Sequence, residues 1–243
     1  MIGWLPDMTV RSEEPEMMDQ MQSDPRALRR TLHLFARVNP ILSGYRELIG
    51  RYICPDLLRT DGRPMRFLDI GAGACDVDVW LMEWCRRKRR PMEIVCLDHN
   101  PRVVRYARRL VRRRSRIEVR MGDARALEQM GERFDYVFAN HVLHHLSDPE
   151  AAEVLRCAER VCDRVLLVND VRRSYGNYAA FSLISPLLGR GSFAANDGRV
   201  SITKGFTVSE FVRLARAADL QGQAAVGVTF PGHVYLVSRK AEG

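Results

Sequence analysis

The sequence lacks the marks of several large protein classes. Its six cysteines form no C-x-x-C pair, and their spacing matches neither a zinc site nor a disulfide framework. No apolar run approaches the roughly 18–20 residues of a membrane span. Residues 1–7 show neither the basic region nor the long apolar stretch of a secretory signal. We therefore expect free thiols in a reducing compartment, no membrane span and a cytoplasmic protein.

Lysine is scarce, because 35 of the 38 basic residues are arginine. The charge is also local: residues 86–116 hold 13 basic and two acidic residues, whereas the rest of the chain holds 25 basic and 28 acidic residues. Such a stretch could bind nucleic acid. However, residues 101–114 place apolar side chains on one helical face and arginines mostly on the other. That pattern is typical of a solvated helix on a sheet, and we favour it over a nucleic-acid partner.

The chain has 243 residues, 46% of them hydrophobic, which suits one domain with a modest extension. Residues 1–23 show no periodicity and are predicted to be a flexible tail. Residues 24–60 are predicted to form a helical cap: one helix begins at Pro25, Asn39-Pro40 caps a second, and Pro55 ends it. Residues 61–243 form the main domain.

Short apolar runs alternate with helical patterns after residue 65, which predicts a parallel, doubly wound α/β sheet. Two runs near the end, separated by Pro231-Gly232, predict an antiparallel hairpin that closes the sheet. The expected strands are 66–70, 93–97, 117–121, 135–139, 164–168, 223–230 and 233–238; the expected helices are 77–88, 101–114, 149–161, 175–188 and 208–218.

The strongest motif is Asp69-Ile70-Gly71-Ala72-Gly73, in which an apolar strand runs into a Gly-x-Gly turn and a helix. Glycines let the backbone turn tightly and approach a ligand, and open α/β sheets bind ligands at the carboxyl ends of their strands. Asp98 and Asp123 follow the next two strands. A carboxylate at the first position can accept from ribose hydroxyls, and one at the second from an adenine amino group. Together they indicate an adenosine site.

Two other nucleotide sites are disfavoured. A dinucleotide site would want a sixth-position Gly or Ala, but Asp76 stands there. The chain also lacks the Gly-x-x-x-x-Gly-Lys-Ser/Thr motif of a P-loop.

At this point residues 65–240 resemble the class I S-adenosylmethionine-dependent methyltransferases. The matching motifs are Asp69–Gly73, Leu97-Asp98, Gly122-Asp123-Ala124 and Phe134–Leu146. Cys75 departs from the pattern, because many members carry a third glycine there. The resemblance implies a Rossmann-like, seven-stranded, mostly parallel sheet with a reversed C-terminal hairpin.

The resemblance also implies the roles of the cofactor-binding residues. Asp69, Gly71 and Gly73 would pass the methionine part of S-adenosylmethionine. Asp98 with His99 would hold the ribose, Asp123 with Ala124 would hold the adenine, and Asn140 would line the methionine and sulfonium side. These assignments are expectations for the structure.

On the acceptor side, His144 and His145 follow the fourth strand, and Asp170 follows the fifth. Small-molecule methyltransferases of this type often carry such a His pair together with such an acid. One His would take a hydroxyl proton and Asp170 would orient its imidazole; structural packing of one His and helix capping by the other is the competing interpretation. A metal site formed by His141, His144 and His145 is disfavoured, because no Cys or acid cluster completes it. We expect no metal.

Residues 171–206 form a long insertion that we expect to be a lid over the acceptor. Its Tyr175, Tyr178 and Phe181 suit an apolar pocket, and Arg172 could hold an acidic acceptor, although all four could equally pack or be solvated. Segments 169–174, 197–201 and 37–39 resemble a bacterial subgroup of small-molecule methyltransferases, some of them linked to polyketide or phenolic-lipid metabolism.

DNA methylation is disfavoured, because the Asn/Asp-Pro-Pro-aromatic element and the Pro-Cys nucleophile of those classes are missing after the fourth strand, where Asn140-His141-Val142-Leu143 stands. Protein arginine methylation would need a paired-Glu loop, which we do not find. The prediction is O-methylation of a small phenolic or polyketide-like hydroxyl. Three further functions stay open: C-methylation of a quinone-like ring, RNA methylation through residues 86–116, and a non-catalytic module that binds an adenosine ligand. The oligomeric state is not predicted.

Overall fold

A computed structural model of the chain describes residues 6–60, 62–188, 191–220 and 222–240. Its described part contains a seven-stranded sheet in the order β3-β2-β1-β4-β5-β7-β6, in which β7 runs antiparallel to both neighbours and the other pairs are parallel. The sheet is therefore the Rossmann-like sheet with a reversed last hairpin that the sequence predicts. The strands are β1 (Met65–Ile70), β2 (Met92–Asp98), β3 (Ile117–Met121), β4 (Phe134–Asn140), β5 (Cys162–Val171), β6 (Ala224–Thr229) and β7 (His233–Arg239).

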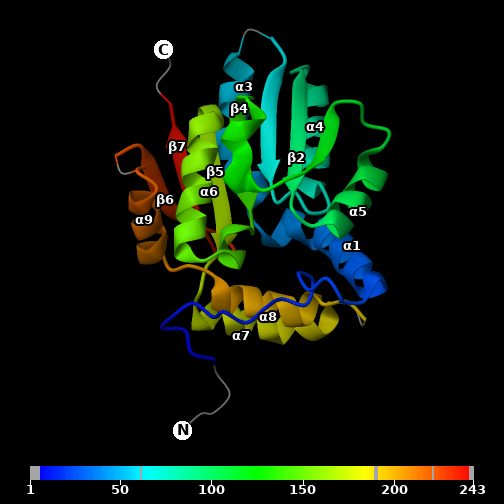
Figure 1. The fold of residues 1–243 in the computed structure, drawn as a ribbon, viewed down its shortest axis with the longest axis vertical. Coiled ribbons are helices and arrows are strands. Elements are labelled where there is room, and N and C mark those ends of the chain that lie inside the picture. Colours follow the sequence, from blue (N-terminus) through cyan, green and yellow to red (C-terminus); the bar gives the residue numbers. More distant parts are fainter. Residues whose placement is uncertain (1–5, 61, 189–190, 221, 241–243) are drawn as a thin grey trace.

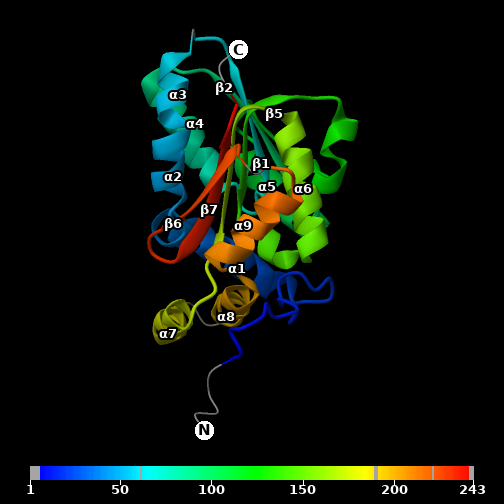
Figure 2. The same cartoon turned by 90° about the vertical axis from the view of Figure 1, so that its left-hand side faces the viewer.

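Helices cover both faces of this sheet (Figures 1 and 2). One face packs against α2 (Tyr45–Tyr52), α3 (Cys54–Arg59), α4 (Asp76–Lys88) and α5 (Pro101–Val111). The other face packs against η1 (Ala124–Met130), α6 (Asp148–Val161) and α9 (Val208–Ala217). Successive strand residues alternate between these two cores, which explains why the central strands are apolar on both sides.

Local sequence signals place most elements within two residues of their observed ends. The capping boxes Ser147-x-x-Glu150 and Thr207-x-x-Glu210 begin α6 and α9 with both reciprocal hydrogen bonds in place. Among the described helices, none combines the length and the hydropathy that crossing a membrane requires.

The prediction for the N-terminal helices was wrong at both prolines. Helix α1 (Pro25–Leu42) continues through Pro40, and it ends at Ser43, whose backbone N–H and hydroxyl both donate to Asn39 O. Gly44 then takes the left-handed conformation, where a Cβ would lie 2.8 Å from Phe230 O. Pro55 lies in the first turn of α3, where its missing N–H costs nothing.

A separate layer lies beyond the carboxyl ends of the parallel strands (Figure 1). It consists of α7 (Tyr175–Ile184), η3 (Ser185–Leu187) and α8 (Ala194–Lys204), so the helix predicted over 175–188 ends in a 3₁₀ turn. Helix α8 was not predicted. Gly198 lets it approach α7 closely, because a Cβ there would meet the Phe181 ring at 2.1 Å.

The N-terminal strap, residues 6–23, runs along α8 (Figure 1). A flexible tail was predicted for residues 1–23, but in the strap Met8 and Glu16 are buried. Arg11 donates to the carbonyls of His144 and Lys204, and Asp197 accepts from the Met17 and Met18 N–H groups. The strap is therefore held by hydrogen bonds that no local sequence pattern predicts. Residues 1–5 lie outside the described part.

Asp56 joins the helical cap to the sheet. Its carboxylate accepts from the Tyr136 hydroxyl at 2.7 Å and from two Arg164 nitrogens at 2.7 and 2.8 Å. Tyr136 is fully buried on β4. This arrangement satisfies a buried phenol and a guanidinium with one carboxylate.

Replacing this carboxylate should destabilise the protein. We expect Asp56→Ala to lower the free energy of unfolding by about 2–4 kcal/mol, because the Tyr136 hydroxyl and the Arg164 guanidinium lose their acceptor. Urea unfolding measures the change. The control is Asp163→Ala, which removes an exposed ion pair with Arg133 and should cost less than about 1 kcal/mol. Equal losses in the two variants would contradict the role given to Asp56.

Candidate functional site

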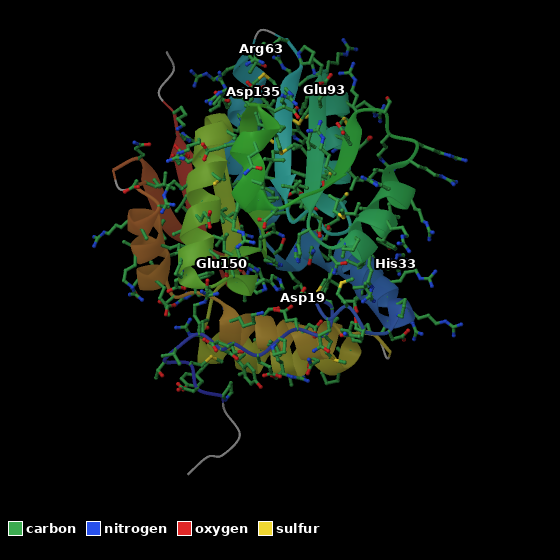
Figure 3. All side chains as sticks on the ribbon, in the orientation of Figure 1. Asp19, His33, Arg63, Glu93, Asp135 and Glu150 are labelled. Carbon is green, nitrogen blue, oxygen red and sulfur yellow. The ribbon has the colours of Figure 1, made fainter. Side chains whose placement is uncertain are left out.

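A cavity of about 350 Å³ lies at the carboxyl ends of β1, β4 and β5. The glycine loop, Asn140 and the segment after β4 form one wall, and α1, α7, α8 and the N-terminal strap form the others. Figure 3 shows the labelled Asp19 of the strap at this edge, whereas Arg63 and Asp135 lie at the opposite edge of the sheet. The cavity therefore lies where open α/β sheets bind ligands.

The glycine loop has the geometry that its sequence predicts. Gly71 and Gly73 have φ angles of +67° and +52°, and a Cβ on Gly71 would meet Val142 Cγ2 at 2.4 Å. Cys75, which replaces the expected third glycine, also has a positive φ, of 55°. Gly71, Gly73 and Asp69 all line the cavity, so the structure brings these three predicted residues together, and their role in binding a cofactor stays a prediction.

The ribose and adenine candidates lie outside the cavity wall. Asp98 accepts from the Gly73 N–H at 3.2 Å and from the Asn100 N–H at 2.9 Å, so it is fixed beside the loop. Asp123 begins η1 and pairs with Arg125 at 2.6 Å on the surface. The assignments of Asp98 with His99 and of Asp123 with Ala124 stay predictions.

Three carboxyl groups crowd behind and beside the glycine loop. Asp69 and Asp78 are buried, and burial together with the Asp78 charge raises the pKa of Asp69 well above its usual value. Burial and the same neighbour raise the pKa of Asp76 to about 7. Asp76 lines the cavity, and its Oδ2 has no hydrogen-bond partner among the described residues. This end of the cavity is therefore suited to a cationic group.

His144 and Asp170 form a buried pair at the other end of the cavity. Asp170 Oδ1 lies 2.6 Å from His144 Nδ1, and the two side chains are 0% and 2% exposed. Burial alone would lower the pKa of His144, but the charge and hydrogen bond of Asp170, with Glu16 beyond, raise it to about 9. The same contact lowers the pKa of Asp170 against the effect of its burial. The structure thus joins His144 to Asp170, as the sequence leads us to expect.

The strap carries two carboxylates to these histidines. Glu16 Oε1 lies 3.3 Å from His144 Nε2 and 3.8 Å from His145 Nδ1. Asp19 Oδ2 lies 2.8 Å from His145 Nδ1. Glu16 falls in the segment predicted to be a flexible tail, and an isolated Glu in an acidic, aperiodic segment gives no signal of its position.

His141 pairs with His233 instead of joining the other histidines. Their Nε2 atoms lie 2.7 Å apart, and both residues line the cavity. Burial lowers the pKa of His141 to about 4 and that of His233 well below its usual value. Both rings are neutral, so one nitrogen donates and the other accepts. The sequence does not predict His233 as a site residue, because it begins a strand in which its position fits the ordinary alternation of side chains.

Glu16, His144 and His145 are a candidate metal-binding group, because they offer three ligand atoms within 4.8 Å of one another. The Lys204 ammonium lies 3.7 Å from Glu16 Oε1 and already supplies a positive charge there. These residues therefore fit an ion-pair cluster better than a cation site. Cys75, Asp78 and Cys96 form a second group, but all three are buried in the core.

Only one of the four predicted acceptor contacts lines the cavity. The cavity-facing residues of the α7 region are Asn177, Ala180, Phe181, Ile184 and Leu188, which follow helical spacing. Tyr175 and Tyr178 fall off that face, and Tyr175 is 50% exposed. Arg172 precedes the helix and is exposed. Of the four, Phe181 therefore lies in the cavity wall, whereas Tyr175, Tyr178 and Arg172 lie outside it, and the lid over an acceptor stays a prediction.

Comparisons with known proteins agree with this geometry. Residues 67–164 match a family model described as a methyltransferase domain. A comparison with curated proteins found no match.

Solved structures with the same fold include three methyltransferases. An O-methyltransferase family protein from Burkholderia thailandensis is 19% identical, with a TM-score of 0.59 over 96% of this chain and 66% of that one. The plantazolicin methyltransferase BpumL is 13% identical, with a TM-score of 0.64 over 93% and 95%. An O-methyltransferase family 2 protein from Planctomyces limnophilus is 20% identical, with a TM-score of 0.58 over 92% and 63%.

The chain spans less than two thirds of the length of the Burkholderia and Planctomyces proteins. At these identities the likeness to the solved structures shows the fold, and the family model matches residues 67–164. Residues 67–164 therefore resemble a methyltransferase domain, and they lie in a Rossmann-like sheet of the kind found in the solved methyltransferases.

Proposed function

We propose that this protein is an S-adenosylmethionine-dependent methyltransferase that O-methylates a small phenolic or polyketide-like hydroxyl. The observation that carries the proposal is one cavity with an unpaired Asp76 oxygen at one end and the His144–Asp170 pair at the other. Solved structures of this fold include two with bound SAH and one with apigenin, a phenolic compound. These relatives support the cofactor and acceptor classes proposed here.

The residues around the glycine loop fit a cationic cofactor. S-adenosylmethionine carries an ammonium and a sulfonium charge, and it supplies an electrophilic methyl group when bound. Asp76, whose Oδ2 is buried without a partner among the described residues, would hold the ammonium, with Asn140 on the sulfonium side. Asp98 would accept from the ribose, and Asp123 with the Ala124 N–H would hold the adenine edge. A cation beside Asp76 would offset the burial and the Asp78 charge that raise its pKa.

The His144–Asp170 pair fits removal of a phenolic proton. Asp170 holds the Nδ1–H of His144, so Nε2 would accept the proton when the imidazole is neutral and Glu16 has left that nitrogen. With a pKa of about 9, the imidazole is mostly protonated at pH 7. It would therefore take a proton from a phenol, whose pKa is about 10, through its minor neutral form, or pair as an imidazolium with a phenolate. The His145 ring lies tilted beside that of His144, with ring centroids 4.1 Å apart, and would support the charge through Asp19.

The remaining cavity wall suits an apolar acceptor. Phe35, Val38 and Leu42 of α1 face Phe181, Ile184 and Leu188 of the α7 region across it. An aromatic ring buried there would leave water at the charged end only, which favours attack of the oxygen on the methyl group.

C-methylation is the second candidate, because a carbon methyltransferase, CurJ, shares the fold at 12% identity with a TM-score of 0.60. The same base would serve that reaction, so the identity of the methylated atom decides between the two. RNA methylation and a non-catalytic binding module have less support. Against RNA methylation, Arg102 of the basic stretch already donates hydrogen bonds to the strap carbonyls of Gln20, Met21 and Ser23. Against a purely binding module, such a protein would not need a base like the His144–Asp170 pair.

Calorimetric titration with S-adenosylmethionine and separately with NADH tests the cofactor assignment. We expect micromolar binding of the sulfonium compound and no binding of NADH. Asp98→Ala should weaken that binding by roughly 1–3 kcal/mol, because charge-assisted hydrogen bonds are lost.

Methyl transfer to phenolic acceptors, with the product assigned by mass spectrometry and NMR, then tests the reaction. Absence of cofactor binding would end the proposal, and a C-methylated product would favour the second candidate.

Cofactor affinity should depend on pH through Asp76. Its pKa of about 7 in the free protein means that it is ionised above that pH and protonated below it. Because only the ionised form attracts an ammonium, affinity should fall by roughly tenfold from about pH 7.5 to about pH 5.5. Calorimetry over that range measures it. Asp76→Asn should bind weakly with a flat profile, whereas the exposed control Asp219→Asn should keep the wild-type slope. A flat wild-type profile would remove Asp76 from the ammonium site.

Asp170→Asn should separate chemistry from cofactor binding. The substitution removes the charge that supports the His144 imidazolium, so we expect turnover to fall by about 10²–10³-fold. Cofactor affinity should stay within about twofold, since Asp170 lies at the His144 end of the cavity, where the acceptor is proposed to bind (the acceptor end). A His144→Ala/His145→Ala double variant should behave in the same way, and Asp163→Asn serves as the surface control. Full activity of either variant at pH 7 would exclude the His base.

A further inference from the structure

Glu16 is a carboxylate bound inside the acceptor end of the cavity by groups from other segments. Its Oε1 accepts from the Ser201 hydroxyl at 3.0 Å. It also lies 3.3 Å from His144 Nε2 and 3.7 Å from the Lys204 ammonium. Glu16 is 2% exposed and Lys204 is 8% exposed, so these contacts are made away from water.

The charges at this position balance only while a carboxylate is present. His144 and Lys204 provide two positive charges, and Asp170 and Glu16 provide two negative ones. Burial opposes ionisation of Glu16, but the neighbouring imidazoles and Lys204 outweigh it and lower the pKa of Glu16 to about 2. Without Glu16 the remaining groups would form a buried site with excess positive charge, which is costly unless another anion enters.

The binding groups and the carboxylate come from separable parts of the chain. Ser201 and Lys204 belong to α8, and His144 belongs to the turn after β4, whereas Glu16 belongs to the N-terminal strap. Glu16, His144 and Ser201 all line the cavity. The rest of the protein thus builds an oxyanion site, and the strap supplies an internal ligand for it.

We infer that the acceptor carries an ionised oxygen, a phenolate or a carboxylate, which replaces the Glu16 carboxylate between Ser201, His144 and Lys204. This inference rests on the proposed function and names its substrate class. A phenolate beside the His144 imidazolium is the same state that proton transfer from a neutral phenol to His144 would produce. The site therefore reaches the reactive pair whether the proton leaves inside the cavity or beforehand in water.

Methylation would also reverse the exchange. The acceptor oxygen forms its bond to the methyl carbon as the carbon–sulfur bond breaks, so the oxyanion becomes a neutral ether or ester and the sulfonium a neutral thioether. The oxyanion site then holds no anion against His144 and Lys204. Return of the Glu16 carboxylate restores the charge balance with His144 and Lys204. Because it competes with the product for the same site, the strap contributes to product release.

Binding of small anions tests the inference without any need for catalysis. Calorimetry compares salicylate with its neutral analogue salicylamide, and pentafluorophenolate with neutral phenol, in enzyme loaded with S-adenosylhomocysteine. An internal competitor reduces apparent affinity by the fraction of molecules it occupies. We therefore expect Glu16→Gln to bind the anions at least about tenfold more tightly than the wild type does. Its affinities for salicylamide and phenol should stay within about twofold of the wild-type affinities. Gain for one anion alone assigns the carboxylate or the phenolate.

The controls use the same strap and the same site. Glu13→Gln changes an exposed strap carboxylate and should match the wild type. Lys204→Met in the Glu16→Gln background should abolish the gain. Equal gains for salicylate and salicylamide, or a gain in Glu13→Gln, would overturn the inference. Failure of methyl transfer to every acceptor, with the anion selectivity intact, would count against the proposed function alone.

A second measurement covers the case in which Glu16→Gln folds poorly. Glu16→Ala truncates the side chain so that free acetate can take the place of the carboxylate. Acetate should raise the Tm of this variant above its value in chloride at equal ionic strength, and it should do so more than in Glu13→Ala. An equal effect of acetate on both variants would show that no oxyanion site is present.

Discussion

One end of the cavity depends on one buried imidazole held between two carboxylates. His144 lies between Asp170 of β5 and Glu16 of the N-terminal strap, and each of the three side chains is at most 2% exposed. A buried charge is stable only when it is paired and hydrogen-bonded. The position of the strap, the turn after β4 and the end of β5 are therefore mutually constrained, and this cluster makes one end of the cavity polar.

Much of the fold is set by patterns that act within a few residues. Apolar runs, capping boxes and the Gly71–Gly73 turn predict the strands, the helices and the carboxyl edge at which ligands bind. The His144–Asp170 contact is also predictable in kind, because β4 and β5 are parallel neighbours and their ends meet at that edge. Topology alone brings together the side chains that lie just after adjacent parallel strands.

The remaining features depend on tertiary contacts that no local pattern encodes. Helix α1 ends where Gly44 meets the Phe230 carbonyl, not at the proline that local rules favour. Glu16 is buried only because α8 supplies Ser201 and Lys204, and α8 itself lies in an insertion with weak helical periodicity. Likewise, His233 is notable only because the antiparallel hairpin places it beside His141.

The cavity is asymmetric in a way that orients an acceptor. Its acids lie beside the glycine loop, its histidines lie after β4 and β5, and its apolar walls come from α1 and α7. In the proposed reaction, the first region would attract a cationic cofactor and the second an acceptor oxygen, so the two reactants would meet along the edge of the sheet. The apolar walls exclude water from the space between them, which strengthens both electrostatic interactions. One segment, the strap, therefore supplies both a wall of the cavity and the carboxylate that pairs with His144.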